Sequence, residues 1–170
     1  MSSHELRTPD TRAPQRAATW AVFATAAPAL ATDGARLLYA GGETANAFLA
    51  TVSARGQPRL HPVMPVLAEG ELWLFIVAMS PKYGDLATSG RFALHSMPTP
   101  AGGEEFALQG TAQQIDDGAT RAQIVAATGG RQGLHDFERL FRCGIVTALY
   151  TYWDGWGTAA AWPRYAKWQA

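Results

Sequence analysis

Between Ala47 and Trp153 the chain is a succession of short apolar or alternating runs, and this pattern constrains the fold more than any other feature. The runs are AFLATVS, RLHPVMPVL, ELWLFIVAM, RFALHSMP, EEFALQGTAQQI and LFRCGIVTALYTYW. Such runs are typical of strands. SARGQ and AEGE, which separate the first three runs, each supply a glycine suited to a positive-φ turn position. The pattern predicts a β domain whose first three strands form a meander, with the second and third strands adjacent and antiparallel.

Short helices are expected around these strands. TWAVFATAAPALATDGARLLYA indicates two of them, with Pro28 opening the second, and DDGATRAQIVAATGG indicates a third. About six strands with short helices between them favour a small closed barrel, because long open edges invite aggregation. In EEFALQGTAQQI one face of the strand is expected to carry Phe106, Leu108, Gly110 and Ala112, and the other Ala107, Gln109, Thr111 and Gln113.

Length and charge restrict the classes of function. The chain has 170 residues with 14 basic and 14 acidic side chains, so one domain is expected and no global charge favours nucleic acid or a membrane surface as a partner. Cys143 is the only cysteine, which excludes an intramolecular disulfide and favours a cytoplasmic location. We expect residues 1–18 to be a flexible tail and residues 19–170 to form the domain.

The segment IVAMSPKYGDLATSG ends an apolar strand and begins a helix at Ser80-Pro81. Lys82 falls in the first helical turn, where the helix dipole makes a cation mildly unfavourable, so an anion would resolve the conflict. If the strands pair as above, Arg59 approaches Lys82. Two cations, the Ser80 hydroxyl and free N–H groups would together form a phosphate site. The alternative is that Arg59 and Lys82 are ordinary solvated charges at strand ends.

Two prolines, Pro62 and Pro65, lie close together in the second predicted strand. Proline cannot donate a ladder hydrogen bond, so this strand is either at an edge, bulged, or presents its backbone to a ligand.

The order of these segments, from FLATVSARGQPRLHPVMPVLAEGELWLFIVAMSPKYGDLATSGRFALHSM to EEFALQGTAQQIDD, resembles the pyridoxamine 5′-phosphate oxidase-like, flavin-binding split-barrel superfamily. The resemblance covers roughly Trp20 to Trp153 and is greatest to actinobacterial members of unassigned substrate. It implies a six-stranded split β-barrel and a homodimer with FMN at the subunit interface.

Carried over to matching positions, the resemblance implies that Arg59, Ser80 and Lys82 hold the FMN phosphate. It places Leu60, His61, Pro62 and Val63 along the isoalloxazine ring and ribityl chain. Ile76, Val77 and Ala78 would border the ring. On this basis, Arg59→Ala and Lys82→Ala are each expected to weaken FMN binding while leaving the fold intact.

The resemblance implies an FMN-dependent oxidoreductase acting on a small, planar or conjugated molecule. The chain ends AAWPRYAKWQA and lacks the C-terminal ending of true pyridoxamine-phosphate oxidases, which argues against that substrate. Two alternatives stay open: an F420-dependent reductase, and a non-catalytic flavin- or tetrapyrrole-binding protein. No histidine follows His135, which weakens haem binding through a C-terminal histidine.

No catalytic residue is assigned, because hydride exchange at a flavin needs no dedicated acid or base. His61 either contacts the ligand or is a hydrogen-bonded structural histidine, and His95 is expected to be structural. The four histidines lack ligand spacing, so no metal site is expected. Cys143 is interpreted as a buried small hydrophobe. Most of the C-terminal aromatic residues are expected in the core or a dimer interface, with one or two covering the flavin. They are Tyr150, Tyr152, Trp153, Trp156, Trp162 and Trp168.

Overall fold

The computed structural model describes residues 16–99 and 102–170. Most of the expected tail over residues 1–18 therefore lies outside the described residues. Ala18 already belongs to the fold, because it exchanges two backbone hydrogen bonds of 2.8 Å with Ile145. No helix in the described ranges combines the length and the apolar composition that crossing a bilayer requires.

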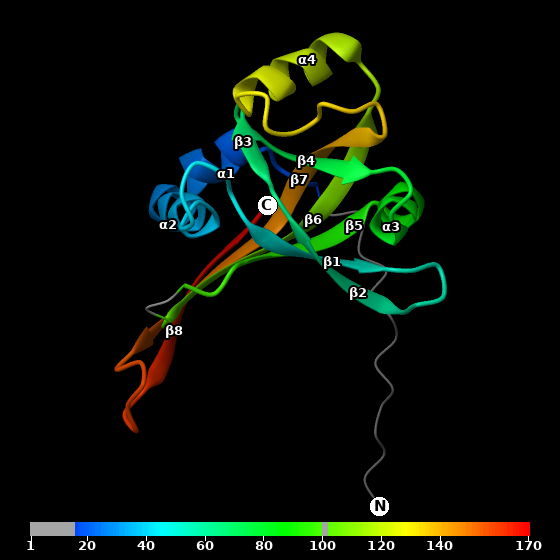
Figure 1. Cartoon of the computed structure of the whole chain (residues 1–170). Helices are drawn as coiled ribbons and strands as arrows, with labels where there is room; N and C mark the ends of the chain where they lie inside the picture. The colour runs from blue at the N-terminus through cyan, green and yellow to red at the C-terminus, as the bar shows by residue number, and fades with distance from the viewer. Residues whose placement is uncertain (1–15, 100–101) are drawn as a thin grey trace, which may run out of the picture.

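The described part of the chain contains four helices and eight strands (Figure 1). The helices are α1 (Trp20–Ala26), α2 (Pro28–Leu38), α3 (Pro81–Ser89) and α4 (Gly118–Ala127). The strands are β1 (Ala47–Val52), β2 (Pro58–Val63), β3 (Val66–Ala68), β4 (Glu71–Val77), β5 (Arg91–Ser96), β6 (Glu104–Ile115), β7 (Glu138–Asp154) and β8 (Trp162–Gln169).

The strands form one antiparallel sheet in the order β2-β1-β5-β6-β7-β4-β3, and β8 pairs with the second half of β7. The expectation of a mainly β split barrel with short helices is confirmed. The expected number of six strands is wrong, since the sheet has eight, and its hydrogen-bonded ladder is not closed. The meander is confirmed only in part: β1 pairs with β2 and β3 with β4, each antiparallel, but the second predicted strand divides into β2 and β3, so that β2 and β4 are not neighbours.

The second predicted strand is interrupted at Pro65. RLHPVMPVL divides into β2 and β3 at Met64 and Pro65, and the two strands lie at opposite ends of the sheet order. Pro62 is in β2, which has β1 as its one partner in the sheet, so its missing N–H interrupts no central ladder. The edge-strand interpretation is therefore confirmed for Pro62. The chain passes from one end of the sheet to the other within two residues, so the sheet must wrap around its core.

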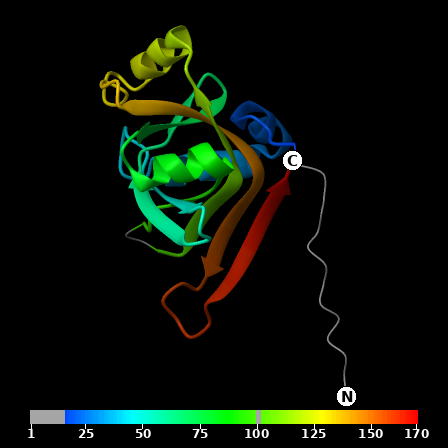
Figure 2. The same ribbon diagram turned by 90° about the vertical axis from the view of Figure 1, so that its right-hand side faces the viewer.

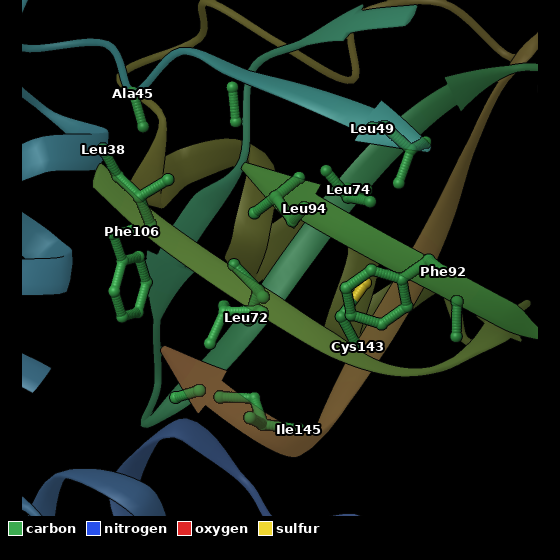
Figure 3. Packing of buried hydrophobic residues seen from close by; sticks show 14 of the residues in the cluster. Leu38, Ala45, Leu49, Leu72, Leu74, Phe92, Leu94, Phe106, Cys143 and Ile145 are labelled. Atoms are coloured by element: carbon green, nitrogen blue, oxygen red, sulfur yellow. The ribbon is translucent and has the colours of Figure 1, made fainter. Parts of the chain in front are cut away.

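The core fills the inside of the wrapped sheet and is shown in Figure 3. The expected alternation in β6 is confirmed, because Phe106, Leu108 and Ala112 are buried. Cys143 is also fully buried in this cluster, as expected, and burial raises the pKa of its thiol well above the ordinary value. A reactive thiolate is therefore not available at this position.

The helices begin where the sequence indicates. The Thr19 hydroxyl accepts from the N–H of Val22 at the start of α1, and the Asp117 carboxylate accepts from the N–H of Thr120 at the start of α4. β8, by contrast, was not expected. It forms with the end of β7 a ribbon that extends away from the barrel, visible in orange and red in Figure 2. Its Trp168 packs on Phe23 of α1 with ring centroids 5.0 Å apart.

Candidate functional site

Arg59 of β2 is held by a carboxylate on α3. Its Nη1 donates to both oxygens of Asp85, at 2.8 and 3.0 Å, and the Thr51 hydroxyl of β1 donates to the same carboxylate at 2.8 Å. Asp85 is 5% exposed, whereas the Arg59 side chain is 38% exposed. These contacts fix α3 against the β1–β2 hairpin, an arrangement visible in Figures 1 and 2. The buried Asp85 carboxylate therefore holds the guanidinium of Arg59 in place, while part of the Arg59 side chain stays exposed to solvent.

The start of α3 differs from the expectation in one respect. Ser80 is the N-cap residue, but its hydroxyl donates to the Val77 carbonyl at 2.6 Å and makes no capping hydrogen bond to the helix. Pro81 follows at the first helical position and has no N–H. Lys82 lies in the first turn, as expected, and is partly buried.

His61 lies among these charged groups. Its Nε2 atom is buried and has no hydrogen-bond partner within the part of the chain that the structure describes. Burial lowers the pKa of His61 below its ordinary value, the Lys82 charge lowers it further and the Arg59 charge adds to this, whereas Asp85 acts in the opposite direction. His61 is therefore close enough to feel all three charges, and its imidazole is kept neutral at neutral pH.

We call these five residues the Arg59 cluster: Thr51, Arg59, His61, Lys82 and Asp85. Strand alternation explains how they meet, because Arg59 and His61 are two residues apart in β2 and stand opposite Thr51 and Leu49 of β1. Lys82 and Asp85 are three residues apart on α3 and therefore neighbours on its surface. With His61 neutral, the cluster carries one net positive charge. Gly84, on the same helix, has no heavy atom within 4 Å of where a Cβ would be, so space is open beside it.

These donors fit the phosphate end of FMN or another phosphate ester. A guanidinium, an ammonium group and an unpartnered imidazole nitrogen are groups that can donate to phosphate oxygens. No group of three or more His, Cys, Asp or Glu side chains suited to a metal ion is found in the described ranges.

The other residues expected at the site divide between different environments. Leu60 and Pro62 are exposed on the opposite face of β2 from Arg59 and His61. Val63 packs against the core, and Ile76 is fully buried in it, so the Ile76 side chain cannot border a ligand. Val77 is exposed and Ala78 partly buried just before α3.

Sequence reasoning missed Asp85 and Thr51. An aspartate inside a helix is a weak signal, since Asp is a poor helix former there. Its partner could be found only from the packing of α3. His95 is exposed on β5, and its Nδ1 lies 2.7 Å from the Ser96 carbonyl oxygen.

A cavity of about 320 Å³ lies elsewhere, between the segment before α1 and strands β4, β6 and β7. It is lined by Ala17, Ala18, Thr19, Glu71, Thr111, Gln113, Arg142 and Gly144. None of these residues belongs to the Arg59 cluster.

Comparison with known proteins identifies the family. The sequence model described as pyridoxamine 5′-phosphate oxidase matches residues 42–139, more than half of the 170 residues. The chain belongs to the pyridoxamine 5′-phosphate oxidase family. The family match runs from just before β1 to the start of β7, so it includes the whole Arg59 cluster and excludes β8. The comparison with curated proteins found no match.

Solved structures with the same fold as this pyridoxamine 5′-phosphate oxidase family member have diverse descriptions. The heme storage protein HutZ from Vibrio cholerae is 17% identical with a TM-score of 0.51, over 59% of this chain and 80% of that one. A heme-binding protein from Mycobacterium smegmatis is 18% identical with a TM-score of 0.59, over 80% and 57%. A protein related to general stress protein 26 from Clostridium acetobutylicum is 12% identical with a TM-score of 0.59, over 81% and 92%. At these identities the similarity concerns the fold alone.

Proposed function

We propose that this family member binds FMN through its phosphate at the Arg59 cluster and acts as an oxidoreductase on a small organic molecule. The observation that carries the proposal is the convergence of Arg59, Lys82 and the unpartnered His61 Nε2 on one face of β2 and α3. Arg59 has further guanidinium N–H groups beyond the Nη1 that Asp85 engages. The Ser80 hydroxyl would bind the phosphate only if it donated to a phosphate oxygen in place of the Val77 carbonyl oxygen.

The remaining residues in this proposal contribute by lining the cofactor. The β2 backbone from Leu60 to Val63 and the segment of Val77 and Ala78 before α3 would lie along the ribityl chain and ring. The flavin, when bound, supplies hydride transfer. The chain contributes orientation of the phosphate, the electrostatics of the Arg59 cluster and exclusion of water by the apolar residues beside it.

We further propose that the chain works as a homodimer with the cofactor at the interface, because the edge strand β2 carries the Arg59 cluster on one face and exposed apolar residues on the other. One outer face of the sheet carries apolar residues on four neighbouring strands, β2, β1, β5 and β6, with His95 and Gln109 among them. The register places Phe48 beside Pro62 and Ala50 beside Leu60, and Leu60 is 63% exposed. We call this the outer apolar face: Phe48, Ala50, Val52, Leu60, Pro62, Ala93 and Ala107. Apolar residues that stay partly or fully exposed on neighbouring strands favour a protein interface.

Titration with FMN and with riboflavin tests the phosphate site. Lys82→Ala is expected to weaken FMN binding by about 1.5–3 kcal/mol, the range for hydrogen bonds to charged groups, or roughly 10- to 150-fold. Riboflavin lacks the phosphate, so its affinity should not change. Lys167→Ala, which removes a lysine from β8, is the control. Equal FMN affinity in Lys82→Ala and the unaltered protein would contradict the assignment, and uptake of F420 alone would favour the deazaflavin alternative.

A non-catalytic tetrapyrrole-binding role is the second candidate. The names of the Vibrio cholerae and Mycobacterium smegmatis proteins support it, since both refer to heme. An absorbance titration with haemin separates the two candidates. Saturable haemin binding that survives Lys82→Ala, with no reduction of bound flavin by NAD(P)H, would favour the tetrapyrrole role.

A further inference from the structure

His61 is the one member of the Arg59 cluster whose polar atom is buried without a partner in the described ranges. Asp85 is occupied by Arg59 and Thr51. The residue opposite His61 on β1 is Leu49, which offers no polar group. A buried nitrogen without a partner carries a desolvation cost, so a ligand that hydrogen-bonds to it gains that energy back.

The balance of charges in the Arg59 cluster indicates how a bound ligand changes the protonation of the His61 imidazole. The groups acting on His61 are Lys82 and Arg59, which are positive, and Asp85, which is negative. A phosphate dianion bound at this net single positive charge would leave one negative charge uncompensated. Protonation of His61 would neutralise the assembly and make Nε2 a third charged donor, beside Arg59 and Lys82.

We propose that His61 takes up one proton from solvent when a phosphate dianion binds beside Arg59 and Lys82, and releases it when the ligand leaves. The proposal rests on the proposed function for the identity of the phosphate ester, and it gives His61 a role beyond lining the ring. Within the Arg59 cluster, His61 is the residue whose protonation accompanies phosphate binding.

The direction of the pH dependence follows from this coupling. In the free protein burial, Lys82 and Arg59 lower the pKa of His61, and a bound dianion would raise it. Between these two pKa values, affinity increases as the pH falls, by up to about tenfold for each unit of pKa difference. Below about pH 6 the phosphate itself takes up a proton, and the gain should level off.

The test measures the pKa of the His61 imidazole and does not depend on enzymatic activity. The ring pKa of His61 is followed by NMR with and without saturating inorganic phosphate, and again with FMN. Loss of one signal in His61→Asn identifies His61 among the four histidines. His95, exposed on β5, is the internal control. We expect both ligands to raise the His61 pKa and leave that of His95 unchanged. Calorimetry in two buffers of different ionisation enthalpy should show proton uptake that is lost in His61→Asn.

Each outcome is decisive for one of the proposals. Saturation by phosphate or FMN without a rise in the His61 pKa would overturn the inference and leave the proposed function standing. A rise with inorganic phosphate but no binding of FMN would support the inference and contradict FMN as the cofactor. Binding of neither would overturn both.

Discussion

Asp85 is buried beneath the Arg59 cluster and receives hydrogen bonds from Arg59 and Thr51. The expectation that Arg59→Ala leaves the fold intact is not supported by this geometry, because the substitution would leave the buried Asp85 carboxylate without its charged partner. Lys82 has no hydrogen bond or ion pair to another described residue, and its replacement therefore perturbs binding more selectively. At the residue scale, ligand affinity and stability are thus linked through Arg59 and separable at Lys82.

A double-mutant cycle measures this link. Arg59→Met is expected to lower the free energy of unfolding by about 2–3 kcal/mol, less than for a fully buried pair because Arg59 is 38% exposed. Adding Asp85→Asn removes the unpaired charge and should recover part of that loss. Urea denaturation of the two single variants and the double variant gives the coupling energy. Strictly additive losses would contradict the interaction.

At the scale of elements, the helices pack on the sheet through different surfaces. In α2, Gly34 lies against the ring of Phe106 on β6, and an added Cβ would overlap that ring. In α3, Gly84 faces open space. The absence of a side chain at Gly34 therefore sets the distance between α2 and the sheet.

Matched Gly→Ala substitutions test this difference. Gly34→Ala should destabilise by about 1–3 kcal/mol, because overpacking against Phe106 exceeds the gain in helix propensity. Gly84→Ala should stabilise by about 0.5–1 kcal/mol, since that gain is unopposed there. Thermal unfolding followed by circular dichroism measures both. Equal effects would contradict the close approach of α2 to β6.

At the scale of the whole molecule, the wrapped sheet leaves the outer apolar face uncovered by any helix of the described chain. Leu60 and Val52 are 63% and 51% exposed on it. If a second copy of the chain packed on the outer apolar face, these side chains would be removed from water, which favours association.

The oligomeric state tests the proposed homodimer. Leu60→Lys should shift sedimentation from dimer toward monomer, because it would bury an unpaired charge in the interface. Val22→Lys on α1, also an exposed apolar residue, is the control and should leave the state unchanged. An unaltered protein that sediments as a monomer would contradict the proposal. A dimer unaffected by Leu60→Lys would place the interface elsewhere.

Much of the fold could be predicted because its signals are local. Pro28, Asp117 and Ser80-Pro81 mark helix starts, and Gly56 and Gly70, both with positive φ, mark the hairpin turns. β8 was missed because its residues are largely exposed and polar or aromatic, without an apolar alternation. Of the residues in the Arg59 cluster, the sequence analysis named Arg59, His61 and Lys82, and it did not name Asp85 or Thr51.

The sequence by itself determined where most strand residues lie, the two faces of β6 and the beginning of α3 beside Lys82, because alternation and helix-start signals depend on residues a few positions apart. Only the tertiary structure decided that β2 and β4 lie apart in the sheet and that α3 crosses to the β1–β2 hairpin. Lys82 is brought near His61, two residues from Arg59, by this packing and not by pairing of β2 with β4. The physical reason is that Asp85, buried far along the chain from Thr51 and Arg59, requires both as hydrogen-bond partners.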